Sequence, residues 1–109
     1  MPNMILDTPV VVSLAIDTIR YIEMENYDDI DCHLEGAWEV YRDDDEPRMA
    51  AYLEMLMLYI SIARDENDPK RGVWGVESLM TIMGLTDDYR VEKQHRTMVE
   101  TVNDIQPEN

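Results

Sequence analysis

The first apolar stretch of the chain has helical spacing. Apolar residues three or four positions apart recur from about Pro9 to Asn26, and this spacing places them on one face of an α-helix. Thr8 suits the N-cap, and Pro9 suits the first helical position, where its missing N–H has no intrahelical bond to lose. The β-branched run 10–12 is also compatible with the start of a strand, which stays open as the alternative. The expected buried face is Val11, Leu14, Ala15, Ile19 and Ile22.

A second helix is predicted from about Ile30 to Arg42. The segment Tyr27–Asp29 before it is typical of a turn that also caps a helix. Gly36, inside the helix, costs about 1 kcal/mol relative to alanine, so we interpret it as the mark of a close helix crossing. The apolar stripe of this helix is Ile30, Leu34, Ala37, Trp38 and Tyr41.

The third helix has the strongest pattern. Pro47 stands at its expected start, and residues 49–63 are apolar on nearly every side of a helix. A helix that is apolar all round is typical of the centre of a bundle, so we expect a central apolar helix near 47–64. Pro69 disfavours helix at the residue before it, and Lys70–Gly75 is interpreted as a loop.

Two further helices complete the prediction. A short one near Val76–Met83 is closed by Gly84, which suits a helix C-terminus. Thr86 then caps a helix that runs from Asp87 to about Ile105. Its apolar side repeats at intervals of four and three, which is typical of a heptad seam between paired helices. The seam is Val91, His95, Met98, Val102 and Ile105.

These elements predict an all-α protein, a small compact bundle of four to five helices. The length of 109 residues and a hydrophobic content of 45% fit one globular domain over residues 1–109, and no composition shift divides the chain. The single cysteine, Cys32, fits a reducing compartment. No basic leader or long apolar span is visible, so we expect a cytoplasmic protein without membrane contact.

Charge changes this picture most. The chain has 24 acidic and 9 basic residues and a formal net charge of −15. Direct binding of nucleic acid or of an anionic membrane needs a basic surface, so both are disfavoured, and a basic protein is the expected partner. Two plainer interpretations stay open, namely that the acids only maintain solubility or that they reflect adaptation to high salt.

The residues that carry enzyme chemistry lack the usual spacings. Cys32 and His33 are adjacent, and on a helix their side chains point about 100° apart, so they cannot readily share one ion. The acidic run 65–68 begins like a calcium loop, but Lys70 stands where that loop needs glycine. His33 is the best acid–base candidate, although a half-buried packing role is the favoured interpretation. We therefore expect no enzyme, no catalytic residues, no metal and no cofactor.

The most specific signal is an acidic stripe on the second helix. Asp28, Asp31, Glu35, Glu39 and Asp43 are three or four residues apart and share the face away from Leu34 and Trp38. Five charges along this helix give about one per 5 Å, against one per ~3.4 Å along a DNA strand. Further acids extend the candidate surface, and Trp74, between two glycines, is a candidate contact residue. The added acids are Asp44, Asp45 and Glu46, with Asp65, Glu66 and Asp68 as a second row if they pack nearby.

In size, charge and helix content the chain resembles the small acidic helical proteins that phages and mobile elements use against host nucleases and DNA-binding complexes. The resemblance implies a non-enzymatic inhibitor that masks a basic, nucleic-acid-binding protein by phosphate mimicry, such as an anti-restriction, anti-CRISPR or nuclease-inhibitor protein. The alternative is a structural or regulatory helical module that self-associates, for example as a homodimer, through the seam of the last helix.

Overall fold

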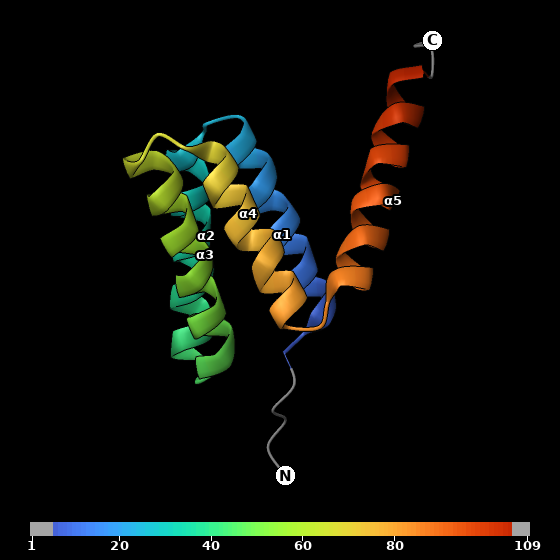
Figure 1. Ribbon diagram of the computed structural model, residues 1–109. Coiled ribbons are helices and arrows are strands. Elements are labelled where there is room, and N and C mark those ends of the chain that lie inside the picture. The colour runs from blue at the N-terminus through green and yellow to red at the C-terminus, as the bar shows by residue number, and fades with distance from the viewer. Residues whose placement is uncertain (1–5, 106–109) are drawn as a thin grey trace.

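The computed structural model describes residues 6–105, which form five α-helices and no strand (Figure 1). The prediction of a small all-α bundle is confirmed. The helices are α1 (Thr8–Glu23), α2 (Tyr27–Asp43), α3 (Pro47–Asp65), α4 (Pro69–Ile82) and α5 (Thr86–Ile105).

Helix α1 contacts each of the other four helices. The β-branched residues 10–12 lie inside this helix, so the strand alternative is wrong; Val11, at 0% exposure, packs on the helical core face. All five residues predicted for the buried face are buried. Asp7 occupies the N-cap position expected for Thr8. The Tyr52 hydroxyl of α3 donates a 2.7 Å hydrogen bond to the Val11 carbonyl, which ties the two helices together.

Helix α3 is the predicted apolar helix, and it packs between α2 and α4. Leu53, Leu56 and Ile60 are fully buried on its inner side. Its outer side exposes Met55 and Leu58. The apolar residues on one side of this helix therefore form part of the core, whereas those on the other side, a methionine and a leucine, lie on the surface.

The same three-residue turn joins every pair of consecutive helices. Its middle residue has a left-handed backbone, with φ of 55° at Glu25, 58° at Asp45, 53° at Asn67 and 75° at Gly84. In each turn the third residue donates its N–H to a carbonyl five residues earlier, as in a Schellman motif. Only one of the four turns carries the glycine that such a backbone favours, so the sequence does not reveal the repetition. This turn ends α1 at Glu23 and starts α2 at Tyr27, earlier than expected at both places.

The segment Lys70–Gly75, expected to be a loop, lies inside α4. Pro69 is at the start of the helix, and the Asp68 carboxylate accepts a hydrogen bond from the Arg71 N–H at 3.2 Å, which caps it. The two glycines of this segment face α3. A Cβ at Gly72 would lie 2.7 Å from the Ala63 Cβ, and one at Gly75 would lie 2.3 Å from the Tyr59 ring. Here glycine permits a close helix crossing, which outweighs its low helix propensity.

Gly36, where a close crossing was expected, has no atom within 4 Å of a Cβ built on it. That expectation is wrong, because Gly36 lies on the solvent side of α2.

Helix α5 diverges from the other four. It starts beside the end of α4 and runs away from the body, so that much of its length stands apart (Figure 1). It contacts only α1 and α4.

Candidate protein-binding surfaces

The predicted stripe on α2 is an exposed surface, which we call the α2 acidic face. Its side chains are exposed except for Asp31, which is half-buried. The opposite side of α2 is held in the core by Ile30 and Leu34, at 1% and 0% exposure. Because the helix is fixed by that apolar side, the carboxylates point outward. The α2 acidic face consists of Asp28, Asp31, Glu35, Glu39 and Asp43, continued by Asp44, Asp45 and Glu46 in the turn to α3.

Charge on this segment is almost all of one sign. Residues 27–46 contain nine acidic side chains and one basic, so more than half of the net charge of −15 lies here. The one cation, Arg42, lies over the Trp38 ring at 4.7 Å from its centre and forms a 3.2 Å ion pair with Asp43. Arg42 thus neutralises one end of the face and leaves the middle, around Glu35 and Glu39, strongly negative.

A hollow of about 460 Å³ lies where α2 meets α3. The indole N–H of Trp38 donates a 2.9 Å hydrogen bond to Glu54 of α3, so the acid and the aromatic ring are held together. Carboxylates beside an aromatic ring suit a guanidinium or ammonium group. The chain's own Arg42 already occupies the ring contact, so the carboxylates are what the hollow offers to another protein. The hollow is lined by Glu35, Trp38, Glu39, Arg42, Glu54 and Met57.

The second acidic row, at residues 65–68, is differently placed. Asp68 of this row lies near Tyr27, at the start of α2. Burial raises the pKa of Tyr27, and the negative charges of Glu25 and Asp68 raise it further. The charges of the row are engaged locally. Asp65 pairs with Arg64 at 3.3 Å, Glu66 pairs with Arg71 at 2.7 Å, and Asp68 caps α4. The row therefore adds little free negative charge to the α2 acidic face.

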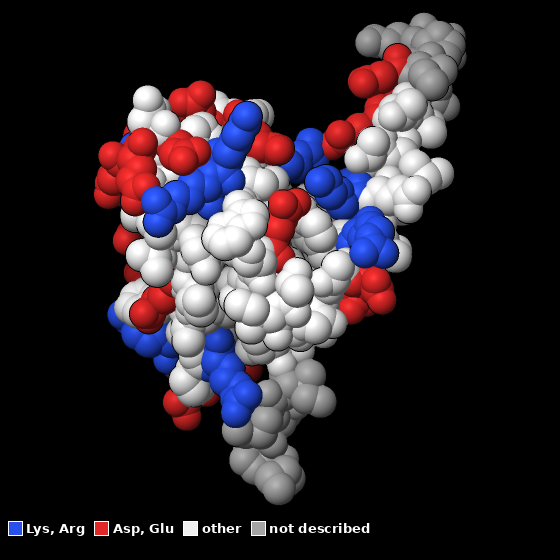
Figure 2. Space-filling model, in the orientation of Figure 1, with Lys and Arg blue, Asp and Glu red and all other residues white. Residues whose placement is uncertain are grey.

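Trp74 is exposed, at 70%, but it lies on α4, which makes no contact with α2. The structure thus separates Trp74 from the carboxylates with which the sequence grouped it. Figure 2 shows a largely uncharged surface over α4. Trp74 borders a hollow of about 480 Å³ with Lys70, Val73 and Glu77. It is a separate candidate contact and not a part of the α2 acidic face.

The outward side of α5 is a surface that the sequence described only as a helix seam. Val91, Met98 and Val102 are exposed at 66%, 62% and 56%, and His95 is also exposed. Val99, beside the seam, is exposed at 45%. The side chain of Ile105 lies outside the described residues. The seam is therefore not covered by any other helix in the described chain.

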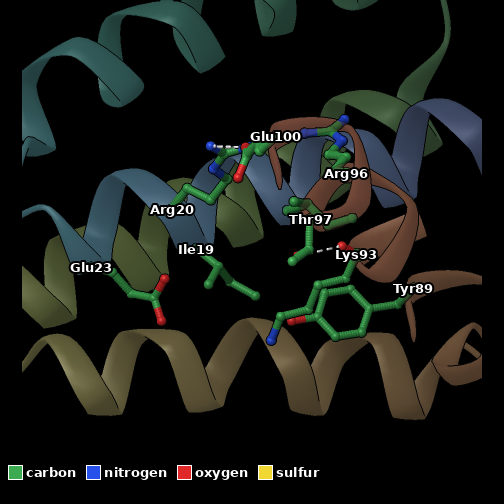
Figure 3. A pocket seen from close by; sticks show the side chains of 9 residues that line it. Ile19, Arg20, Glu23, Tyr89, Lys93, Arg96, Thr97 and Glu100 are labelled. Atoms are coloured by element: carbon green, nitrogen blue, oxygen red, sulfur yellow. Dashed lines mark hydrogen bonds and ion pairs between the residues drawn. The ribbon is translucent and has the colours of Figure 1, made fainter. Parts of the chain in front are cut away.

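The side of α5 that faces α1 is polar. Arg96 donates 2.6 Å hydrogen bonds to Asp17 and to the Ser13 hydroxyl, and it also pairs with Glu92 at 3.1 Å. Arg20 and Glu100 form a further ion pair across the two helices, at the rim of a pocket of about 160 Å³ (Figure 3). Four of the charged groups that line this pocket, Arg20, Lys93, Arg96 and Glu100, form ion pairs that join α5 to α1 and α4.

The residues with reactive or metal-binding side chains lie apart. Cys32, His33 and His95 are exposed, so the half-buried packing role expected for His33 is wrong. Within residues 6–105, no three histidine, cysteine or carboxylate side chains are grouped to hold a metal ion. None of the described helices is both long and apolar enough to cross a membrane.

Comparison of the chain with protein-family models, with curated proteins and with solved structures gave no match.

Proposed function

We propose that the protein is a non-enzymatic inhibitor that masks a basic, nucleic-acid-binding protein through the α2 acidic face. The observation that carries this proposal is the near absence of compensating cations on residues 27–46, where nine acids share one arginine. Like charges three or four residues apart destabilise a helix by roughly 0.2–0.5 kcal/mol per pair, so the arrangement opposes folding. A function in binding explains why the cost is tolerated.

The spacing of the charges resembles that of phosphates. Helix α2 has 17 residues and is about 25 Å long at 1.5 Å per residue. With the acids of the following turn, the eight carboxylates of the α2 acidic face spread over residues 28–46 give about one per 3.5 Å, against one charge per ~3.4 Å along a DNA strand. A groove lined with lysine and arginine, which normally holds a phosphate backbone, would meet a similar density of negative charge on α2.

The hollow between α2 and α3 gives this surface a specific contact. An arginine of the partner would find carboxylates at Glu35, Glu39 and Glu54, beside the Trp38 ring over which the chain's own Arg42 already lies. Long-range attraction between a chain of charge −15 and a basic groove would speed the encounter and would weaken as salt rises. The partner class is a nuclease, restriction, CRISPR or recombination component, and the host setting is a phage or mobile element in a cytoplasm.

Competition with DNA tests the proposal. The immobilised protein should retain proteins that were first selected from a lysate on double-stranded DNA resin, and a short DNA duplex should release them. The triple variant Asp31→Asn, Glu35→Gln, Glu39→Gln should bind about tenfold to hundredfold more weakly, if each exposed contact contributes roughly 0.5–1 kcal/mol. Its fold should be unchanged by circular dichroism, because all three side chains are exposed or half-buried.

A matched control separates the α2 acidic face from net charge. The variant Asp7→Asn, Asp88→Asn, Asp104→Asn removes the same three charges from exposed positions on other parts of the surface. It should bind nearly as tightly as the parent. Equal losses in the two triple variants, or a retained protein that DNA does not release, would contradict phosphate mimicry by α2.

A further inference from the structure

Helix α5 is attached to the rest of the molecule by its polar side. At about 100° per residue, Tyr89, Lys93, Arg96 and Glu100 share one side of the helix. Tyr89 is buried there and donates a 2.9 Å hydrogen bond to Glu77 of α4, while Arg96 and Glu100 pair with α1. The orientation of α5 is therefore fixed by buried and paired polar groups.

The seam lies about 180° away from that side, by the same helical rotation. Val91, His95, Met98 and Val102 are accordingly exposed, on the side of α5 away from α1 and α4, the two helices that it contacts. Figure 1 shows no helix on the far side of α5. An amphipathic helix in a monomer normally buries its apolar side and exposes its polar side. Helix α5 does the reverse, which leaves a strip of three apolar residues and one histidine in water, namely Val91, His95, Met98 and Val102.

Charge indicates what can cover this strip. The carboxylates of α5 between residues 89 and 103 are Glu92 and Glu100, and both are paired, with Arg96 and Arg20 respectively. The outward strip over the same residues carries no acid. It offers nothing to the basic partner proposed for α2. In a chain of charge −15, it is also a surface that a second copy can approach without meeting carboxylates.

We propose that the outward face of α5 binds the same face of a second copy, with the two helices antiparallel. The seam has the four–three spacing with which like helices interlock. With the two-fold axis near residues 96–97, Val91 lies opposite Val102 of the other copy and His95 lies opposite Met98. The bodies of the two copies then lie on the outer sides of the helix pair, because each body contacts its α5 from the opposite side.

Antiparallel pairing is selected over parallel pairing by charge. Asp88 occupies the seam position one heptad before His95. In a parallel pair, Asp88 would meet Asp88 of the other copy, and Asp87 would lie near Glu92 of the other copy, which are repulsive contacts. In the antiparallel pair, Asp88 lies opposite position 105 of the other copy and not opposite a second Asp88, Glu92 flanks Val99, and Gln94 flanks Thr101. No two acids between residues 88 and 105 are then brought together.

Sedimentation equilibrium of the whole chain tests this proposal. The seam has four described positions per copy, so we expect a small interface, below about 1,200 Å² in total, and a dimer that forms at micromolar concentration. Val102→Lys should weaken dimerisation at least about tenfold, although it lowers the repulsive net charge, because it places an ammonium group in the apolar contact. A chain that stays monomeric up to about 500 µM, far above the range of specific micromolar pairs, would overturn the proposal.

Val40→Lys is the matched control. Val40 lies on α2 and is 57% exposed, against 56% for Val102, so the two substitutions add the same charge at equally exposed valines. The control should dimerise as well as the parent or better. An equal loss in both variants would contradict a specific α5 contact.

Salt separates this proposal from the proposed function of α2. Screening relieves repulsion between two copies of charge −15, so added salt should strengthen the dimer, whereas it should weaken binding of a basic partner. A dimer that salt dissociates would be held by charge and would overturn the apolar contact.

Orientation is tested in a Cys32→Ser background. Mixing Val91→Cys with Val102→Cys chains should give more disulfide than either chain alone, and equal or greater self-crosslinking would overturn the antiparallel arrangement.

Discussion

Helices α2 and α5 are both outer helices of this molecule, and they are built in opposite senses. Helix α2 is held by its apolar side, with Ile30 and Leu34 fully buried, and turns its carboxylates to solvent. Helix α5 is held by Arg96, Glu100 and Tyr89 and turns valine and methionine to solvent. Both sequences have a clear amphipathic period, so periodicity alone does not tell which side of a helix faces the body.

The difference suggests two surfaces with different chemistry. The proposed contact of the α2 acidic face with a cationic partner would gain from long-range attraction and would lose by screening. The proposed contact between two α5 helices would gain from burial of apolar area, at roughly 25 cal/mol per Å², and the charge of the chain would oppose it by repulsion. One molecule can therefore carry one contact that salt weakens and another that salt strengthens.

The largest expected loss of stability is at a core position, and we compare it with the loss at a position of the α5 seam. Leu56→Ala should lower the free energy of unfolding by about 2–5 kcal/mol, because Leu56 is fully buried and its loss leaves a cavity. Met98→Ala should change it by less than about 0.5 kcal/mol in the monomer, since Met98 is 62% exposed. Urea unfolding at low protein concentration measures both. A large cost for Met98→Ala in dilute protein would show that the α5 seam packs on its own chain.

Smaller changes in stability, opposite in sign to each other, are expected when two helical glycines are replaced by alanine. Gly72→Ala should cost about 1–3 kcal/mol, because its Cβ would lie 2.7 Å from the Ala63 Cβ and 3.1 Å from the Tyr59 carbonyl oxygen. Gly36→Ala should stabilise by up to about 1 kcal/mol, since it faces open space on the solvent side of α2. Thermal unfolding of the two variants checks the signs. A loss of stability in Gly36→Ala would mean that the outer side of α2 is not free.

The smallest effect concerns the attachment of α5. Arg96→Ala should cost about 1 kcal/mol or less, because its ion pairs are partly solvated, with side chains 23% exposed for Arg96 and 36% for Asp17. The loss should appear as faster hydrogen exchange in α5 while α1–α4 keep their protection. Arg90→Ala is the control, since its pair with Asp87 is exposed and lies within α5. Equal exchange in the two variants would show that Arg96 does not fix the helix.

Local pattern was sufficient for most of the fold. The apolar positions of α1 and α2, the proline at the start of α3 and Gly84 after α4 were each predictable, because a helix face and a helix end depend on residues within a few positions of one another. The acidic stripe on α2 was predictable for the same reason. Five carboxylates spaced by three or four residues must share a side. That this side faces out is shown by the burial of Ile30 and Leu34 on the other side of α2.

Contacts between distant segments decided the rest. Lys70–Gly75 resembles a loop because it follows a proline and contains two glycines, which have low helix propensity. The segment is nevertheless helical, and its glycines face Ala63 and Tyr59 of α3, which leave no room for a Cβ. Gly36 is also a glycine inside a helix, but no atom lies within 4 Å of a Cβ built on it. The turns at Glu25, Asp45 and Asn67 adopt the left-handed backbone without the glycine that usually marks it, although asparagine and aspartate tolerate it. Only the tertiary structure showed that α5 docks by its charged side, since Asp17 and Arg96 are 79 residues apart in the chain.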